Sequence, residues 1–72
     1  MREGFRELRN SNSQLLCVAN DGTGEVETLG PHKSSYNFKI PIGGTFTVVR
    51  GNVISLVTRT ASTFTVADTI AA

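Results

Sequence analysis

Hydrophobic and polar positions alternate between residues 36 and 58, and two short turn signals interrupt the alternation. Gly43-Gly44 and Gly51-Asn52 are residue pairs that suit the positive φ angles of two-residue hairpin turns. The pattern therefore predicts three antiparallel strands over residues 36–42, 45–50 and 53–58.

The two turns also fix which residues face each other. A loop at Gly43-Gly44 places Phe38 opposite Val49, and a loop at Gly51-Asn52 places Val49 opposite Ile54. Since side chains alternate along a strand, one face collects six large side chains. This predicted core face consists of Tyr36, Phe38, Ile40, Val49, Ile54 and Leu56.

The opposite face is also partly apolar, because it carries Phe46, Val48, Val53 and Val57. An antiparallel sheet with one solvated face normally has a polar outer side. We therefore expect this face to be covered, either by a second layer of the same chain or by another subunit.

The rest of the chain reads as further short strands with polar turns between them. The additional strands are expected over residues 14–19, 25–29 and 62–67. The predicted fold is all-β, a small antiparallel β-sandwich or barrel of six to seven short strands. Residues 1–9 are expected to form an N-terminal arm or first strand, residues 10–67 a single β domain, and residues 68–72 a C-terminal tail.

The length of the chain indicates that contacts with neighbouring chains contribute to its stability. Seventy-two residues lie near the lower limit for a self-sufficient hydrophobic core. Cys17 is the only cysteine, so no internal disulfide can compensate. Oligomerisation is the remaining common route to stability, and we expect a homo-oligomer such as a trimer.

Charge and hydropathy argue against a membrane partner and disfavour nucleic acid as a partner. The net charge of +1 is spread among scattered basic and acidic residues, with no basic stripe for nucleic acid. No apolar run is long enough for a membrane span or a signal peptide. The expected location is the virion if the protein is viral, and the cytoplasm otherwise.

No residue pattern indicates catalysis or a cofactor. The loop from Asp21 to Glu25 resembles a calcium loop only in having two carboxylates, and a glycine-rich turn explains it. His32 follows a proline in a polar loop without a partner for acid–base chemistry. Cys17 lies in an apolar run, which favours a buried, inert thiol. We expect a protein that is not an enzyme and holds no metal.

The aromatic residues leave a binding module open as an alternative. Tyr36, Phe38, Phe46 and Phe64, with Lys39 and Arg50 nearby, suggest a stacking platform for single-stranded nucleic acid. The predicted register, however, separates Tyr36 and Phe38 from both cations. A carbohydrate site favours exposed Trp or Tyr, and this chain has no Trp and one Tyr.

The favoured hypothesis is a structural assembly protein that works through protein–protein contacts, as virion decoration or cement subunits do. Phe5 and Leu8 are expected to anchor residues 1–9 on a neighbouring chain. The expected interface comprises Phe5, Leu8, Phe46, Val48, Arg50, Val53 and Val57. The alternative is a small β-barrel that binds carbohydrate or single-stranded nucleic acid.

Overall fold

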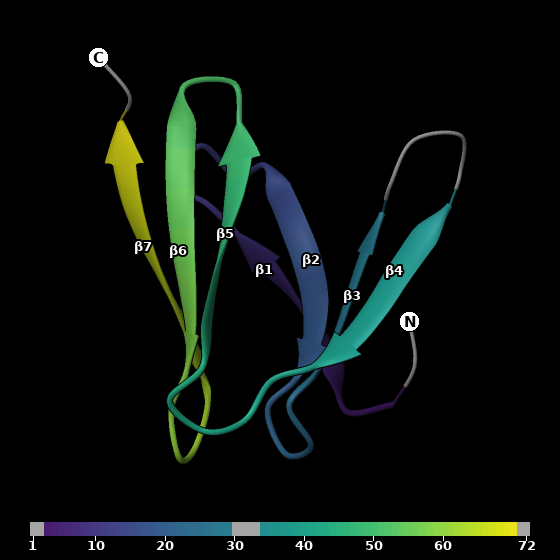
Figure 1. Cartoon of the computed structure of the whole chain (residues 1–72). Coiled ribbons are helices and arrows are strands. Elements are labelled where there is room, and N and C mark those ends of the chain that lie inside the picture. The colour runs from purple at the N-terminus through teal and green to yellow at the C-terminus, as the bar shows by residue number, and fades with distance from the viewer. Residues whose placement is uncertain (1–2, 30–33, 71–72) are drawn as a thin grey trace.

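The described part of the chain forms seven strands in two antiparallel sheets (Figure 1). The computed structural model describes residues 3–29 and 34–70, and these residues include no helix. The strands are β1 (Phe5–Arg9), β2 (Leu15–Asn20), β3 (Glu25–Leu29), β4 (Ser35–Lys39), β5 (Thr45–Arg50), β6 (Val53–Arg59) and β7 (Phe64–Ile70). The first sheet has the order β1-β2-β3-β4 and the second the order β5-β6-β7. The all-β prediction is confirmed.

The hairpin between β5 and β6 has the register that the sequence predicts. Val49 lies opposite Ile54 and Thr47 lies opposite Leu56. Gly51 adopts a φ of 61°, which a glycine reaches without the steric penalty of a Cβ atom. This turn signal was therefore sufficient to fix the strand pairing.

The predicted hairpin at Gly43-Gly44 is wrong. β4 pairs with β3 instead, and residues 40–44 carry the chain from the first sheet to the second. Both glycines extend the ladder of β6, since the Gly43 amide donates to the Arg59 carbonyl and the Arg59 amide donates to the Gly44 carbonyl. The Ile40 side chain is buried at this crossing, where the Arg59 guanidinium donates to the Ile40 carbonyl at 2.8 Å.

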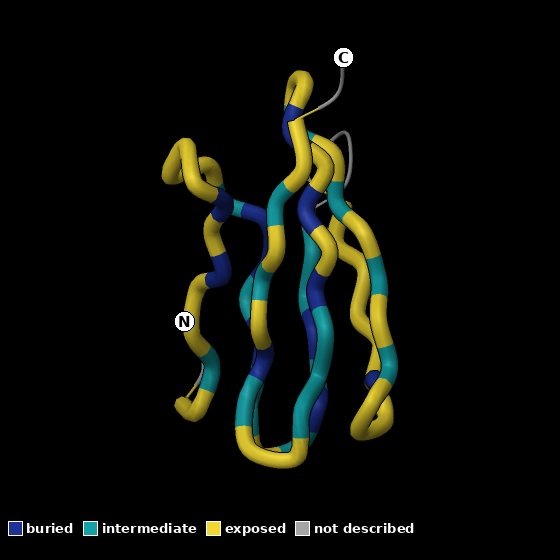
Figure 2. Tube along the Cα trace, turned by 90° about the vertical axis from the view of Figure 1, so that its left-hand side faces the viewer, coloured by how far each residue is buried: buried dark blue, intermediate teal, exposed yellow. Residues whose placement is uncertain are grey.

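The predicted core face is also wrong for β5 and β6. Val49, Ile54 and Leu56 are 57%, 37% and 41% exposed, whereas Val53 and Val57 are fully buried. Figure 2 shows buried and exposed residues alternating along the strands. The side chains that a second layer was expected to cover are thus the core, and the covering layer is the β1-β2-β3-β4 sheet. That sheet contributes Leu8, Leu16, Cys17, Ala19 and Val26.

Both terminal segments contain integral strands. β1 pairs with β2 along its length, and its Leu8 side chain is 2% exposed and packs in the core. At the other end, β7 continues to Ile70 and pairs with β6, beyond the predicted strand end at residue 67. Residues 5–9 and 68–70 therefore belong to the two sheets.

Candidate interaction surfaces

Most residues of the expected interface lie inside the molecule. Leu8, Val53 and Val57 are buried, and Phe46 and Val48 are half-buried against the core. In the folded chain Leu8, Val53 and Val57 are therefore not accessible to another chain, and Phe46 and Val48 are accessible only in part. Their placement follows from the inverted β5–β6 face and from the incorporation of β1 into a sheet.

Arg50 and Phe5 are the remaining residues of that set. The Arg50 guanidinium reaches from β5 to β2, where it donates to the carbonyl oxygens of Leu15 at 3.2 Å and Leu16 at 3.5 Å. It therefore joins the two sheets. Phe5 is half-buried at the start of β1, opposite Asn20.

The outer face of the second sheet is the most distinctive accessible surface. Alternation and the strand registers place nine side chains on it. They are Thr45, Thr47, Val49, Ile54, Leu56, Thr58, Thr65, Ala67 and Thr69. We call this surface the threonine–aliphatic face. None of its nine side chains carries a charge, although 18% of the residues in the chain are charged.

The dimensions of the threonine–aliphatic face limit what it contributes to binding. Three strands at ~4.8 Å spacing and seven residues at ~3.4 Å per residue cover roughly 340 Å². A standard stable interface buries about 800 Å² on each partner. The face is thus suited to a contact that is weak alone and becomes strong only when it is repeated or combined with another contact.

A second accessible surface is β4, whose five side chains are all exposed. Tyr36 is 56% and Phe38 39% exposed, and the Phe38 ring meets Phe46 edge to face with ring centroids 5.3 Å apart. A shallow pocket of about 240 Å³ lies over β3 and β4. It is lined by Glu25, Val26, Asn37, Phe38 and Lys39.

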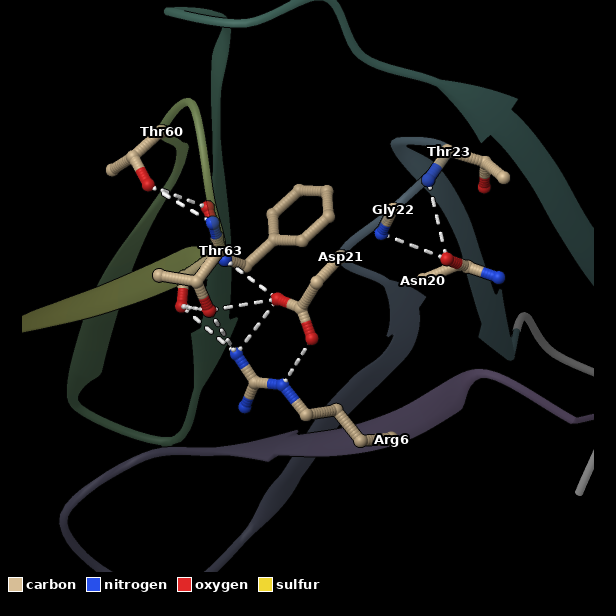
Figure 3. Close-up of polar contacts among 8 residues, drawn as sticks. Arg6, Asn20, Asp21, Gly22, Thr23, Thr60 and Thr63 are labelled. Carbon is tan, nitrogen blue, oxygen red and sulfur yellow. Dashed lines mark hydrogen bonds and ion pairs between the residues drawn. The ribbon is translucent and has the colours of Figure 1, made fainter.

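The loop that resembled a calcium site is a structural clasp (Figure 3). The Asp21 carboxylate accepts hydrogen bonds from Arg6 at 2.7 and 3.1 Å, from the Thr63 hydroxyl at 2.8 Å and from the Phe64 amide at 2.8 Å. The hydrogen bond from Arg6 is the main cause of an Asp21 pKa well below its usual range. Asn20 supports the turn by accepting from the Gly22 and Thr23 amides. The Asp21 oxygens are therefore already coordinated by protein donors.

The Cys17 thiol has a setting that differs from that of a reactive cysteine. Cys17 is buried, and its desolvation raises the thiol pKa to about 11. A thiol with that pKa is almost entirely protonated at neutral pH, so it is a poor nucleophile. His32 lies outside the described residues. Within residues 3–29 and 34–70, no group of three or more His, Cys, Asp or Glu is placed to hold a metal ion.

Comparisons with known proteins add no information on the function of this chain. No family model, curated protein or solved structure matches the chain. In the described part of the chain, no helix has the length and apolar character needed to cross a bilayer.

Sequence reasoning missed the threonine–aliphatic face, because its aliphatic residues had been assigned to the core. The signal available was the absence of charge at alternate positions of residues 45–49, 54–58 and 65–69.

Proposed function

We propose that the protein is a structural assembly subunit that works through protein–protein contacts. The observation that carries this proposal is the threonine–aliphatic face, a charge-free surface that exposes Val49, Ile54 and Leu56. Charged residues are depleted at the centres of protein interfaces, because desolvating a charge is costly. Two such faces, or one such face and a flat apolar partner, meet without an unpaired charge.

The energetics favour a role in a repeated assembly over a single pairwise contact. Burying the exposed parts of these three aliphatic side chains is worth roughly 2–4 kcal/mol in total, at about 1.5–3 kcal/mol for each complete side chain. Association costs an estimated 4–15 kcal/mol. A subunit of a multimeric shell makes this contact many times, as decoration or cement subunits of virions do, and that is the specific form of the proposal.

The test is the oligomeric mass of a variant with a charge at the centre of this face. Leu56→Glu is expected to lower the mass measured by light scattering across a concentration series, while its β-sheet circular dichroism stays unchanged. Asn12→Glu places the same charge at an exposed position of the β1–β2 turn and is the matched control. The proposal fails if wild-type protein is a monomer at all concentrations, or if Leu56→Glu assembles as wild type does. A monomer that binds a glycan or an oligonucleotide would favour the binding-module alternative.

A further inference from the structure

The free edge of β4 lacks the features that keep the other sheet edges from pairing with another chain. Figure 1 shows β4 at the outer side of the first sheet, and none of the strands in residues 3–29 and 34–70 lies beyond it. Edge strands normally carry several charges, inward-pointing charges or bulges, which oppose pairing with another chain. β1 has three charged residues and a register shift, β5 turns Arg50 inward, and β7 turns Asp68 inward. β4 has only Lys39, at its end.

The backbone groups that face this edge can be assigned from the ladder between β3 and β4. The Ile40 amide donates to the Gly24 carbonyl at 2.9 Å, and these residues continue the register that pairs Glu25 with Lys39. Hydrogen-bonded and non-bonded pairs alternate in an antiparallel ladder. Tyr36 and Phe38 therefore bond to β3, whereas the amides and carbonyls of Ser35, Asn37 and Lys39 point to the free edge.

We propose that β4 pairs with β4 of a second copy of this chain, antiparallel, across a two-fold axis at Asn37. This proposal rests on the assembly function in taking another copy as the partner. In this register Asn37 faces its own counterpart, Ser35 faces the partner's Lys39, and Tyr36 faces the partner's Phe38. The three residues of each copy whose backbone groups point to the free edge, Ser35, Asn37 and Lys39, all lie in hydrogen-bonded pairs. The three pairs give six backbone hydrogen bonds.

Side chains select this register over its neighbours. A two-fold axis normal to the sheet keeps each face on its own side, so the axis must lie midway between one residue of β4 and the same residue of the partner. An axis at Tyr36 or Phe38 pairs only three residues of β4, whereas an axis at Asn37 pairs all five. The Asn37 register also places Tyr36 and the partner's Phe38 in non-hydrogen-bonded pairs, where cross-strand side chains approach most closely.

Charge and burial agree with the same arrangement. Lys39 meets the neutral Ser35 of the partner, so no like charges face each other across the new ladder. Tyr36 and Phe38 are 56% and 39% exposed in the single chain, and each ring gains an aromatic neighbour in the pair. Phe38 already contacts Phe46, so the new cluster continues the existing core.

Disulfide trapping tests both the contact and its register. Across a hydrogen-bonded pair the two Cα atoms are about 5.5 Å apart, within the range of a disulfide. Asn37→Cys is expected to shift from monomer to dimer mass on a non-reducing gel after mild oxidation. Ser35→Cys and Lys39→Cys alone should stay monomeric, because each position lies about 14 Å from its own counterpart. A mixture of these two variants should form the disulfide-linked heterodimer.

A second measurement keeps the test independent of cysteine chemistry. Tyr36→Lys is expected to shift the light-scattering mass towards monomer, whereas Asn52→Lys in the exposed β5–β6 turn should not. Equal trapping at all three cysteine positions, or no trapping at Asn37→Cys in a folded variant, would overturn the proposal. So would a monomer whose β4 edge binds only an unrelated extended peptide.

The two assembly surfaces can be separated by combining variants. Asn37→Cys in the Leu56→Glu background should still form the disulfide dimer, because β4 and the threonine–aliphatic face lie on different sheets. Trapping that persists while Leu56→Glu leaves larger assemblies intact would support the β4 pair and reject the proposed role of the threonine–aliphatic face. If the disulfide dimer is lost in the Leu56→Glu background and Leu56→Glu also disperses larger assemblies, the result would support the threonine–aliphatic face and reject the β4 pair.

Discussion

The Arg6 guanidinium and the Asp21 carboxylate form a two-bond ion pair, with Nε–Oδ2 and Nη2–Oδ1 distances of 2.7 and 3.1 Å. The same Arg6 nitrogen, Nη2, also donates to the Thr63 hydroxyl and the Phe64 carbonyl, each at 3.0 Å. The pair thus joins β1 and the turn after β2 to the start of β7 in the other sheet. A small domain without a disulfide gains from such a clasp, because it fixes the two sheets relative to each other.

Asp21→Asn is expected to lower the free energy of unfolding by about 1–3 kcal/mol, because it leaves Arg6, Thr63 and Phe64 with a weaker acceptor. Urea unfolding followed by circular dichroism measures this change. Glu7→Gln is the matched control, since it removes an exposed ion pair with Arg9 at 2.9 Å and should cost less than about 1 kcal/mol. Equal effects of the two substitutions would show that the clasp contributes no more than a surface pair.

The acid dependence of stability should come largely from two carboxylates. Asp68 accepts from the Ser11 amide at 2.6 Å and the Ser55 hydroxyl at 2.8 Å, and the bond from Ser11 is the main cause of its lowered pKa. Asp21 has a lowered pKa as well. Groups with a lowered folded-state pKa stabilise the fold fully above their unfolded value of ~3.9 and lose this contribution as the pH falls through the folded value.

Urea midpoints at pH 7, 4, 3 and 2 are therefore expected to decrease steeply below about pH 4. The Asp21→Asn/Asp68→Asn double variant should be less stable at pH 7 and show a flatter decrease. Parallel pH profiles for wild type and double variant would assign the acid sensitivity to other groups.

Strand positions were predictable because alternation and turn residues are local signals. The range of β3 agrees with the predicted 25–29, and that of β5 with 45–50. Local signals failed at Gly43-Gly44, where Ile40 enters the core and the chain changes sheets. The pair resembles a hairpin turn in sequence, and only the long-range contacts with Arg59 distinguish the two outcomes.

The inner and outer faces of the second sheet were not predictable from polarity. The inner face carries Arg50, Arg59 and Asp68 beside its aliphatic residues, and a polarity rule assigns such a face to solvent. These charged groups lie inward because they bind backbone or hydroxyl groups of other segments. The outer face carries no charge and exposes three aliphatic side chains, so the same rule assigns it to the core. The threonine–aliphatic face was missed for this reason.

Two aliphatic residues on opposite sides of β6 test directly which face of the second sheet is the core. Val57→Ala is expected to lower the free energy of unfolding by about 2 kcal/mol, from the two lost methyl groups and the cavity they leave. Ile54→Ala removes more carbon but is 37% exposed in the single chain, so it should cost less than Val57→Ala. The measurement is urea unfolding at a concentration where both variants are monomeric. A larger loss for Ile54→Ala would restore the core face expected from the sequence.

Gly24 and Gly43 share a positive φ, at 81° and 87°, but differ in their surroundings. A Cβ atom at Gly24 would collide with the Arg59 guanidinium and the Ile40 carbonyl, whereas a Cβ atom at Gly43 would meet nothing within 4 Å. Both alanine substitutions carry the backbone penalty of about 1–2 kcal/mol. Gly24→Ala should cost a further ~1–3 kcal/mol, because the crossing between the sheets must shift to make room.

Thermal unfolding of the two alanine variants measures this difference, and Gly43→Ala is the control for backbone strain alone. The hydrogen bond from Arg59 to Ile40 closes the crossing, so Gly24→Ala should also expose the Ile40 region to faster amide hydrogen exchange. If both variants unfold at the same temperature, the contact between Arg59 and the Gly24 turn is loose, and the crossing is held by the burial of Ile40 instead.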